Sequence, residues 1–328
     1  MPAVEPIYLG VDIGGTKVAA GLVTHRGEIL SKVRIPMRSD GDAAAGLLAV
    51  ERAIDAALEL KPAVNATISG IGIVSPGPLD PRRGIVVNPV NLPCWRNFPL
   101  ADAIAKSRRL STLLDNDANA AALAESLWGA GVGYSSVFYV TIGTGIGTGL
   151  VLDKHIYHGR TGAAVEGGHV SIDYHGPLCT CGKKGCIEAL AAGPAVARRA
   201  RTALETSDGR HSKLLALAGG NAASASSEMV AKAWREGDAL AAAVLTETVD
   251  LIAVWLGNMI DLLEPDVIIF GGGMGELVAA WFGRLREQLP AWSVNSRCAE
   301  TPIVRAHYGA DSGIAGGAAL CVSASQIR

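Results

Sequence analysis

Three cysteines and one histidine stand at a spacing that suits a metal ion. The four residues are His169, Cys179, Cys181 and Cys186. Three thiolates and one imidazole make a closed tetrahedral zinc site, whereas free or oxidised thiols are the alternative. In a reducing compartment, clustered cysteines favour metal over disulfide. Because four protein ligands leave no open position, we predict a structural zinc that holds the loops bearing Glu166 and Glu188.

Three glycine-rich turns each follow a short apolar run. They contain Gly14, Gly15, Thr16 and Lys17; then Thr141, Gly143, Thr144 and Gly145; and finally Gly271, Gly272 and Gly273. Without a Cβ, such turns expose backbone N–H groups that bind phosphate, so three of them indicate a polyphosphate ligand. Any single turn could instead only close a hairpin. Neither P-loop nor dinucleotide-binding spacing is present, which argues against those folds.

Two aspartates could serve phosphoryl transfer. Asp12 enters the first glycine turn, where a carboxylate could hold magnesium or its water shell; an Asx turn is the alternative. Asp117 lies where a strand passes into a helix, and transfer to an alcohol needs a carboxylate near the attacking hydroxyl. Asp115 and Asp117 could instead cap that helix.

Apolar patterns outline an α/β protein in which a strand, glycine turn and strand occur twice. Strands are expected at Ile7–Val11, Val18–Val23, Ile29–Ile35, Ile68–Val74, Ser111–Leu114, Val137–Ile142, Leu150–Asp153 and Val267–Phe270. Helices are expected at Ala43–Leu60, from Asp115–Asn119 to about Trp128, and at Ala239–Leu263. The whole run Gly143–Gly149 is expected to be the second turn. The repetition predicts two related domains that face each other.

Composition narrows the function classes. The chain has 328 residues, which suits two domains, and a formal net charge of −2, which gives nucleic acid no electrostatic support. The N-terminus lacks a signal-like pattern, and glycine or charge interrupts the most apolar stretches, so we expect a cytoplasmic protein without a membrane span.

Taken in order, these motifs resemble the ROK family of repressors, open reading frames and kinases. The likeness covers nearly the whole chain, and its elements are Asp12–Lys17, Gly72–Pro78, Asn91–Trp95, Asn116–Asn119, Thr141–Gly147, Glu166–His169, Cys179–Glu188 and Gly271–Gly273. It implies a two-domain actin-like, ribonuclease H-like α/β fold with an interdomain cleft. The expected domains are 1–117, joined by a C-terminal helix at 311–328, and 118–310, which carries the zinc.

The resemblance also implies roles. Asp117 matches the base that accepts a proton from a sugar's 6-hydroxyl as it attacks the γ-phosphate of Mg-ATP. Residues that match sugar ligands are Asn91, Asn116, Glu166, His169 and Glu188, so His169 would serve both zinc and sugar. The first two glycine turns match phosphate loops, and Gly271–Gly273 matches the adenosine loop. A homodimer is the family tendency.

Glucose is the favoured substrate, because Asn91–Trp95 and the cysteine-rich stretch look most like bacterial glucokinases. N-acetylmannosamine and N-acetylglucosamine are alternatives, and polyphosphate is a further possible donor. Val165 and Cys94 occupy positions where the family usually has glycine, which bears on substrate choice. A sugar-sensing repressor is a weaker reading, since the first strand begins near Ile7 and leaves no room for a DNA-binding module upstream.

Overall fold

The computed structural model describes residues 5–61, 66–206 and 208–326. Its first sheet has the strand order β3-β2-β1-β4-β7. These strands are β1 (Glu5–Ile13), β2 (Lys17–Thr24), β3 (Ile29–Pro36), β4 (Ala66–Ser75) and β7 (Thr112–Asn116). Strands β1, β2 and β3 form an antiparallel meander, while β1, β4 and β7 run parallel. Parallel strands bring their carboxyl ends to one edge of the sheet.

The second sheet repeats this topology in the order β10-β9-β8-β11-β12. Its strands are β8 (Ser136–Ile142), β9 (Ile146–Leu152), β10 (His155–Ile156), β11 (Val267–Gly271) and β12 (Ile303–Arg305). Numbered in chain order, each sheet reads 3-2-1-4-5, which confirms the predicted internal repeat. A small hairpin pairs β5 (Leu79–Asp80) with β6 (Ile85–Val86).

The second glycine turn is shorter than predicted. It ends at Gly145, because β9 already begins at Ile146. Gly149 therefore belongs to a strand, where a Cβ would lie 2.7 Å from the carbonyl oxygen of Ala118. Here glycine permits a close approach between backbones, and the prediction of a turn through Gly149 was wrong.

The helices are α1 (Ala43–Glu59), α2 (Leu100–Arg108), α3 (Asp117–Trp128), α4 (Ile187–Ala191), α5 (Gly193–Leu204), α6 (Lys213–Leu217), α7 (Ser227–Arg235), α8 (Ala239–Leu263), α9 (Gly273–Val278), α10 (Phe282–Gln288) and α11 (Ser312–Gln326). Short 3₁₀ turns are η1 (Gly167–His169), η2 (Asp208–His211), η3 (Ala222–Ser224), η4 (Ala279–Trp281), η5 (Leu289–Ala291), η6 (Cys298–Glu300) and η7 (Gly309–Asp311). The predicted helices α1, α3 and α8 are confirmed, and so is the expected C-terminal helix, seen as α11, whose predicted last two residues lie outside the described part of the chain. Most of the others span too few turns to show a clear apolar period.

The chain divides into two compact units. Unit 1 comprises Met1–Tyr139, Gly149–Val165 and Ala306–Arg328, and unit 2 comprises Val140–Thr148 and Glu166–Arg305. Strands β8 and β9 each contribute residues to both units. This division groups α3 with the N-terminal part of the chain, whereas the sequence placed residues 118–310 in the second domain.

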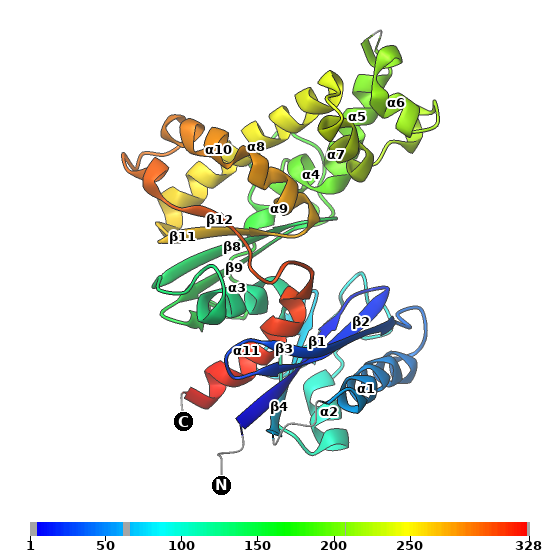
Figure 1. Cartoon of the computed structure of the whole chain (residues 1–328), viewed down its shortest axis with the longest axis vertical. Coiled ribbons are helices and arrows are strands. Elements are labelled where there is room, and N and C mark those ends of the chain that lie inside the picture. Colours follow the sequence, from blue (N-terminus) through cyan, green and yellow to red (C-terminus); the bar gives the residue numbers. More distant parts are fainter. Residues whose placement is uncertain (1–4, 62–65, 207, 327–328) are drawn as a thin grey trace. The chain divides into compact units, whose positions relative to one another are not determined.

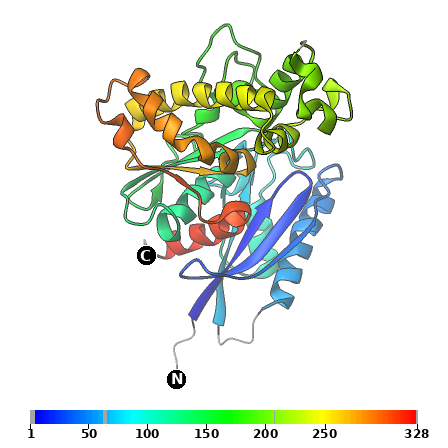
Figure 2. The ribbon, with the colours of Figure 1, turned by 45° about the horizontal axis from the view of Figure 1, so that its top comes forward.

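In unit 1 the first sheet carries α1 and α2 on one face and α11 on the other (Figures 1 and 2). Alternate residues of β1 point to opposite faces: Ile7, Leu9 and Val11 join the core with α1, while Tyr8 packs beside α11. On the α11 face, a Cβ at Gly10 would overlap the Ile314 carbonyl oxygen. Glycine thus lets α11 lie directly on the sheet.

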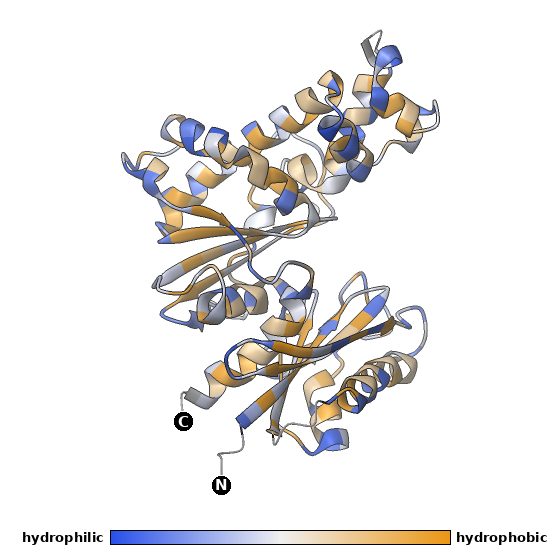
Figure 3. Cartoon of the chain, in the orientation of Figure 1, coloured by the Kyte–Doolittle hydropathy of each residue, from blue (hydrophilic) through white to orange (hydrophobic). Residues whose placement is uncertain are grey.

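In unit 2 the longest helix is α8, which packs with α4, α5, α7 and α10. Within the described residues, α8 is the one helix whose length and apolar composition would allow it to cross a membrane. Half of its most apolar window is buried in the protein, which is typical of a core helix. Apolar residues also dominate the strands of both sheets (Figure 3).

A buried carboxylate ties α3 to the segment that leads into α11. Glu125 is fully buried; its Oε1 accepts hydrogen bonds from the backbone N–H groups of His307 (2.8 Å) and Tyr308 (3.0 Å). Its Oε2 accepts from the N–H of Ala130 (2.8 Å). One side chain therefore satisfies three backbone donors in unit 1.

Replacing Glu125 by alanine would leave these three donors without their acceptor. Because the three donors are only partly buried, water can replace part of what the carboxylate provides, and we expect Glu125→Ala to lower the free energy of unfolding by about 1–3 kcal/mol. Urea titration measures this, with Glu59→Ala on exposed α1 surface as the control. A loss below about 1 kcal/mol would contradict the assignment.

Candidate functional site

Three predicted site residues of unit 1 lie at the carboxyl edge of its parallel strands. Asp12, near the end of β1, pairs with Val74 of β4, and Ser75 pairs with Asn116, the last residue of β7. Asp117 follows as the first residue of α3. The edge therefore joins the first glycine turn to the Asn116–Asp117 pair.

The start of α3 is capped by Asn116 rather than by either aspartate considered from the sequence. Its side-chain oxygen accepts from the N–H groups of Ala118 (2.9 Å) and Asn119 (3.3 Å). Asp117 is exposed, and its Oδ1 also accepts from Ala118. Asp115, in contrast, is only 3% exposed. The strand-to-helix junction thus buries one carboxylate and presents the other.

The first glycine turn lies against the loop that carries Asn91. The N–H of Gly14 donates to the Lys17 carbonyl oxygen (2.9 Å), which closes the turn. A Cβ at Gly15 would lie 2.8 Å from the Asn91 carbonyl oxygen. Thr16 and Lys17 are exposed at the turn. Glycine is required at position 15 because a side chain would push the Asn91 loop away.

The Asn91 loop is anchored by its apolar neighbours. Leu92 and Trp95 are almost fully buried, and the Trp95 indole N–H donates to the Ala43 carbonyl oxygen (3.2 Å). Asn91 itself is exposed. Cys94 is half-buried, and a Cβ at Gly46 of α1 would lie 3.0 Å from its sulfur. Burial raises the pKa of the Cys94 thiol.

Asp12 lies against the first turn of α11. A Cβ added at Gly313 would overlap the Asp12 carboxyl group. Burial raises the pKa of Asp12, and the nearby positive charges of Lys17 and Arg34 oppose this shift. A bound cation would favour the charged carboxylate in the same way, which suits a residue expected to hold magnesium or its water.

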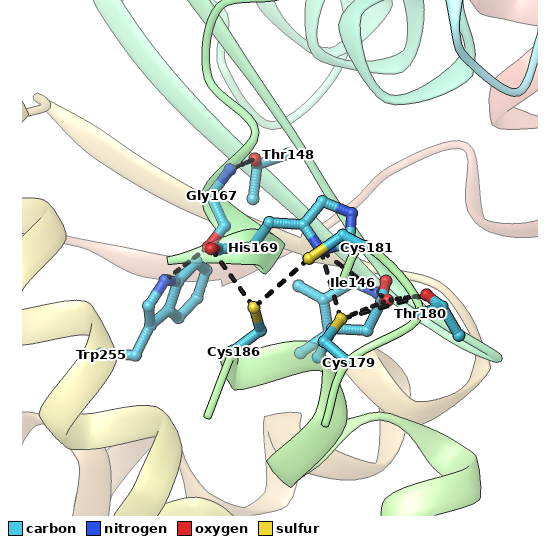
Figure 4. A network of polar contacts seen from close by, with 10 residues as sticks. Ile146, Thr148, Gly167, His169, Cys179, Thr180, Cys181, Cys186 and Trp255 are labelled. Carbon is cyan, nitrogen blue, oxygen red and sulfur yellow. Dashed lines mark hydrogen bonds and ion pairs between the residues drawn. The ribbon is translucent and has the colours of Figure 1, made fainter. Parts of the chain in front are cut away.

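In unit 2 the four predicted zinc ligands converge (Figure 4). The ligand atoms of His169, Cys179, Cys181 and Cys186 all lie within 4.8 Å of one another. The Cys179 sulfur lies 3.6 Å from His169 Nδ1, and the sulfurs of Cys181 and Cys186 are 3.7 Å apart. Tetrahedral zinc with ordinary bond lengths requires about 3.6 Å between S and N and about 3.8 Å between two S atoms. The cluster therefore fits zinc.

The environments of the thiols differ within this cluster. A hydrogen bond from the Lys183 backbone is the main cause that lowers the pKa of Cys181. Burial raises the pKa of Cys186 to about 12. Because metals bind thiolates, a buried thiol of this kind ionises when a cation compensates its charge.

Glu188 links the cluster to the second glycine turn. Its Oε2 accepts from the N–H of Ile146 (3.0 Å), and its Oε1 lies 3.9 Å from His169 Nδ1. Gly167, next to exposed Glu166, donates its N–H to the Thr148 hydroxyl (2.8 Å). Glu166, His169 and Glu188 thus belong to a hydrogen-bonded framework around η1 and α4.

A cavity of about 650 Å³ in unit 2 adjoins two of the predicted nucleotide loops. It is lined by Gly143, Thr144, Gly193, Pro194, Ala197, Arg201, Ser226, Ser227, Glu228, Ala231, Arg235, Gly273, Met274 and Leu277. Gly272, with φ of +79°, turns the end of β11 into α9, and a Cβ there would lie 2.7 Å from the Thr141 hydroxyl. Gly271 ends β11 and is buried.

Most of this lining was missed from the sequence. Residues of α5 and α7, such as Pro194 and Glu228, carry no phosphate-binding pattern, and only the folded chain brings them beside Gly143. The Pro at the start of α5 and the serines before Glu228 are helix-start signals, which mark local structure and not a ligand.

Val165 has an unusual backbone conformation. Its φ is +60°, in the left-handed region that a β-branched residue rarely adopts. This accounts for the expected family preference for glycine directly before the glutamate, since glycine enters that region without strain.

Comparison with known proteins then identifies the relationship. The ROK family model matches residues 8–324. The chain belongs to the ROK family. It is 35% identical over 313 residues to a glucokinase of Thermotoga maritima, an alignment that covers 95% of this chain and 96% of the relative. An N-acetylmannosamine kinase of Yersinia pseudotuberculosis is 34% identical over 318 residues, with 97% and 98% covered.

A solved ROK glucokinase from Streptomyces griseus, in complex with glucose and AMPPNP, superposes with a TM-score of 0.81. It is 31% identical, and the match covers 96% of this chain and 98% of that one. The predicted α/β actin-like, ribonuclease H-like fold is confirmed. The comparison of sequences and the comparison of structures therefore lead to the same family.

Metal analysis tests the zinc site. We expect about one zinc per chain, and Cys186→Ser should lose the metal and unfold at lower temperature, because one thiolate of the closed tetrahedron is missing. Cys94→Ser lies outside the cluster and should keep the metal. Purified protein without metal, with Cys179, Cys181 and Cys186 freely alkylated, would exclude the site.

The strain at Val165 also makes a measurable prediction. A left-handed non-glycine residue costs about 1–3 kcal/mol, and glycine loses about 0.5–1 kcal/mol through its greater freedom when unfolded. Val165→Gly should therefore raise the free energy of unfolding by about 1 kcal/mol. Ala164→Gly is the matched control, and it should lower stability. Equal losses in both variants would show that Val165 is unstrained.

Proposed function

We propose that this ROK protein is a cytoplasmic sugar kinase that transfers the γ-phosphate of Mg-ATP to the 6-hydroxyl of a hexose, most specifically glucose. The observation that carries the proposal is the junction of β7 and α3. There the Asn116 cap leaves the exposed Asp117 carboxylate at the sheet edge that also bears Asp12 and the first glycine turn.

Asp117 is the proposed general base. Its carboxylate would accept the proton of the attacking hydroxyl, and the Asn116 amide N–H₂ stays available for a sugar oxygen because the side-chain oxygen is occupied by the helix cap. Asn91, Glu166, His169 and Glu188 are the other proposed sugar ligands. Their hydrogen bonds to the sugar would fix the attacking hydroxyl relative to the γ-phosphate.

The nucleotide is proposed to occupy the 650 Å³ cavity of unit 2, with its adenosine between α5, α7 and α9. Backbone N–H groups of Gly143–Gly145 and of Gly14–Lys17 would stabilise the phosphates. Asp12 would hold magnesium, which neutralises charge on the transferred phosphoryl group. Glu188 bonded to Ile146 supports the shape of the second turn.

Zinc has a structural role in this proposal. His169 Nδ1 faces the sulfur cluster, so Nε2 on the other side of the ring is free to contact a sugar. The cluster would orient η1, which Glu166 directly precedes, and α4, which carries Glu188. No step of the transfer requires the ion.

N-acetylmannosamine is the alternative substrate that a specific observation favours. The N-acetylmannosamine kinase relative is 34% identical, against 35% for the glucokinase, so overall similarity does not separate the two sugars. N-acetylglucosamine is a further alternative acceptor, and polyphosphate is a candidate alternative donor. A homodimer is proposed from the family resemblance alone.

A coupled ADP-release assay with Mg-ATP and a panel of hexoses and N-acetylhexosamines tests the function. We expect glucose to have the highest kcat/KM, and Asp117→Asn to lower kcat by about 10²–10⁴-fold, since the base is lost while binding groups remain. Asp102→Asn on α2 is the matched control. Undiminished turnover in Asp117→Asn would refute the base, and no turnover of any sugar would refute the kinase.

A further inference from the structure

Asp115, two residues before the proposed base, is a buried carboxylate whose two oxygens have separate partners. Its Oδ1 accepts from the backbone N–H of Asn116 (2.7 Å) and from the Asn119 side-chain amide (3.3 Å). Its Oδ2 lies 2.6 Å from His158 Nε2. One oxygen therefore holds the start of α3, and the other is held by a residue far along the chain.

His158 comes from the segment after β10, which the sequence did not connect with the β7–α3 junction. The pair lies beside a cavity of about 310 Å³ in unit 1 that is lined largely by apolar groups, including Leu113 and Leu123. The Asp115 side chain is only 5% exposed, whereas that of His158 is 31% exposed. The carboxylate is therefore shielded from water, and a hydrogen bond to it is stronger than at an open surface.

The direction of this hydrogen bond follows from the chemistry of the partners. An ionised carboxylate only accepts, so His158 donates from Nε2 to Oδ2. With Oδ2 held, rotation of the Asp115 carboxyl group is restricted, and Oδ1 stays on the Asn116 N–H and the Asn119 amide. Both of these groups belong to the turn that carries Asp117.

We propose that His158 is a positioning residue for Asp117, acting through the Asp115 carboxylate. The inference rests on the proposed function of Asp117 as the general base. Loss of the His158 donor releases Oδ2, the carboxyl group turns, and the first turn of α3 shifts with its exposed aspartate. Because proton transfer depends on geometry, such a shift lowers the rate of the chemical step more than substrate binding.

The experiment compares His158→Leu with His158→Gln, whose side-chain amide can still donate to Asp115. His155→Leu is the matched control: His155 lines the same cavity, but its Nδ1 bonds to the nearby Asp153 carbonyl oxygen. We expect His158→Leu to lower kcat by about tenfold to a hundredfold with KM for ATP changed less than about twofold. His158→Gln should recover most of kcat, and His155→Leu should resemble the wild type.

A double-mutant cycle that combines His158→Leu with Asp115→Asn tests whether His158 acts through the Asp115 carboxylate. If His158 acts through Asp115, His158→Leu adds little to the loss already caused by Asp115→Asn. Losses that multiply would overturn the proposal, as would unchanged kcat in folded His158→Leu, or equal losses in the leucine and glutamine variants. Should the leucine variant fail to fold, the same cycle is run with His158→Asn.

Failure of the kinase proposal is recognised separately, because the wild type would then turn over no sugar. In that case the amide NMR signals of Asn116 and Ala118 report on the positioning. His158→Leu should shift both signals, and His158→Gln should return them toward the wild type. Unchanged signals in His158→Leu would overturn the positioning role.

Discussion

The need to satisfy the first N–H groups of α3 shapes the most informative part of unit 1. Asn116 caps the helix with its side-chain oxygen, while buried Asp115 accepts from the Asn116 backbone. These two side chains take the places that Asp117 could otherwise fill as a cap. The junction can then expose Asp117 at the carboxyl edge of parallel strands, where Asp12 also lies.

Unit 2 uses a different means to hold its loops. Three sulfurs and an imidazole converge on one point between η1 and the start of α4, where little regular structure would otherwise fix the backbone. Glu188 extends this framework to the second glycine turn through the N–H of Ile146. Glu188, which lies beside the residues that fit a zinc ion, thus also supports the end of the turn proposed to bind phosphate.

Glycine has distinct uses in the two units, and local sequence does not separate them. Gly10 permits contact between β1 and α11, and Gly149 permits contact between β9 and α3, whereas Gly272 turns a strand into a helix. In the sequence, Gly149 and Gly272 both resemble turn glycines, whereas Gly10 falls in an expected strand. The prediction of a turn through Gly149 was wrong because this glycine serves a close contact with the Ala118 backbone. Ala118 is distant in the chain, so local sequence does not reveal that contact.

The sequence by itself determined the ROK family, the repeated strand pattern and the four metal-ligand candidates, because these depend on residue type and short spacing. Only the tertiary structure decided that Asn116 caps α3, that Asp115 pairs with His158, and which residues of α5 and α7 line the cavity. The Asn116 cap is local, but Asp115 and Asp117 beside it offered competing caps. The Asp115–His158 pair and the cavity lining join residues that lie far apart along the chain, so neither periodicity nor motif spacing contains them. They arise when packing brings separate elements together and leaves buried polar groups to find partners.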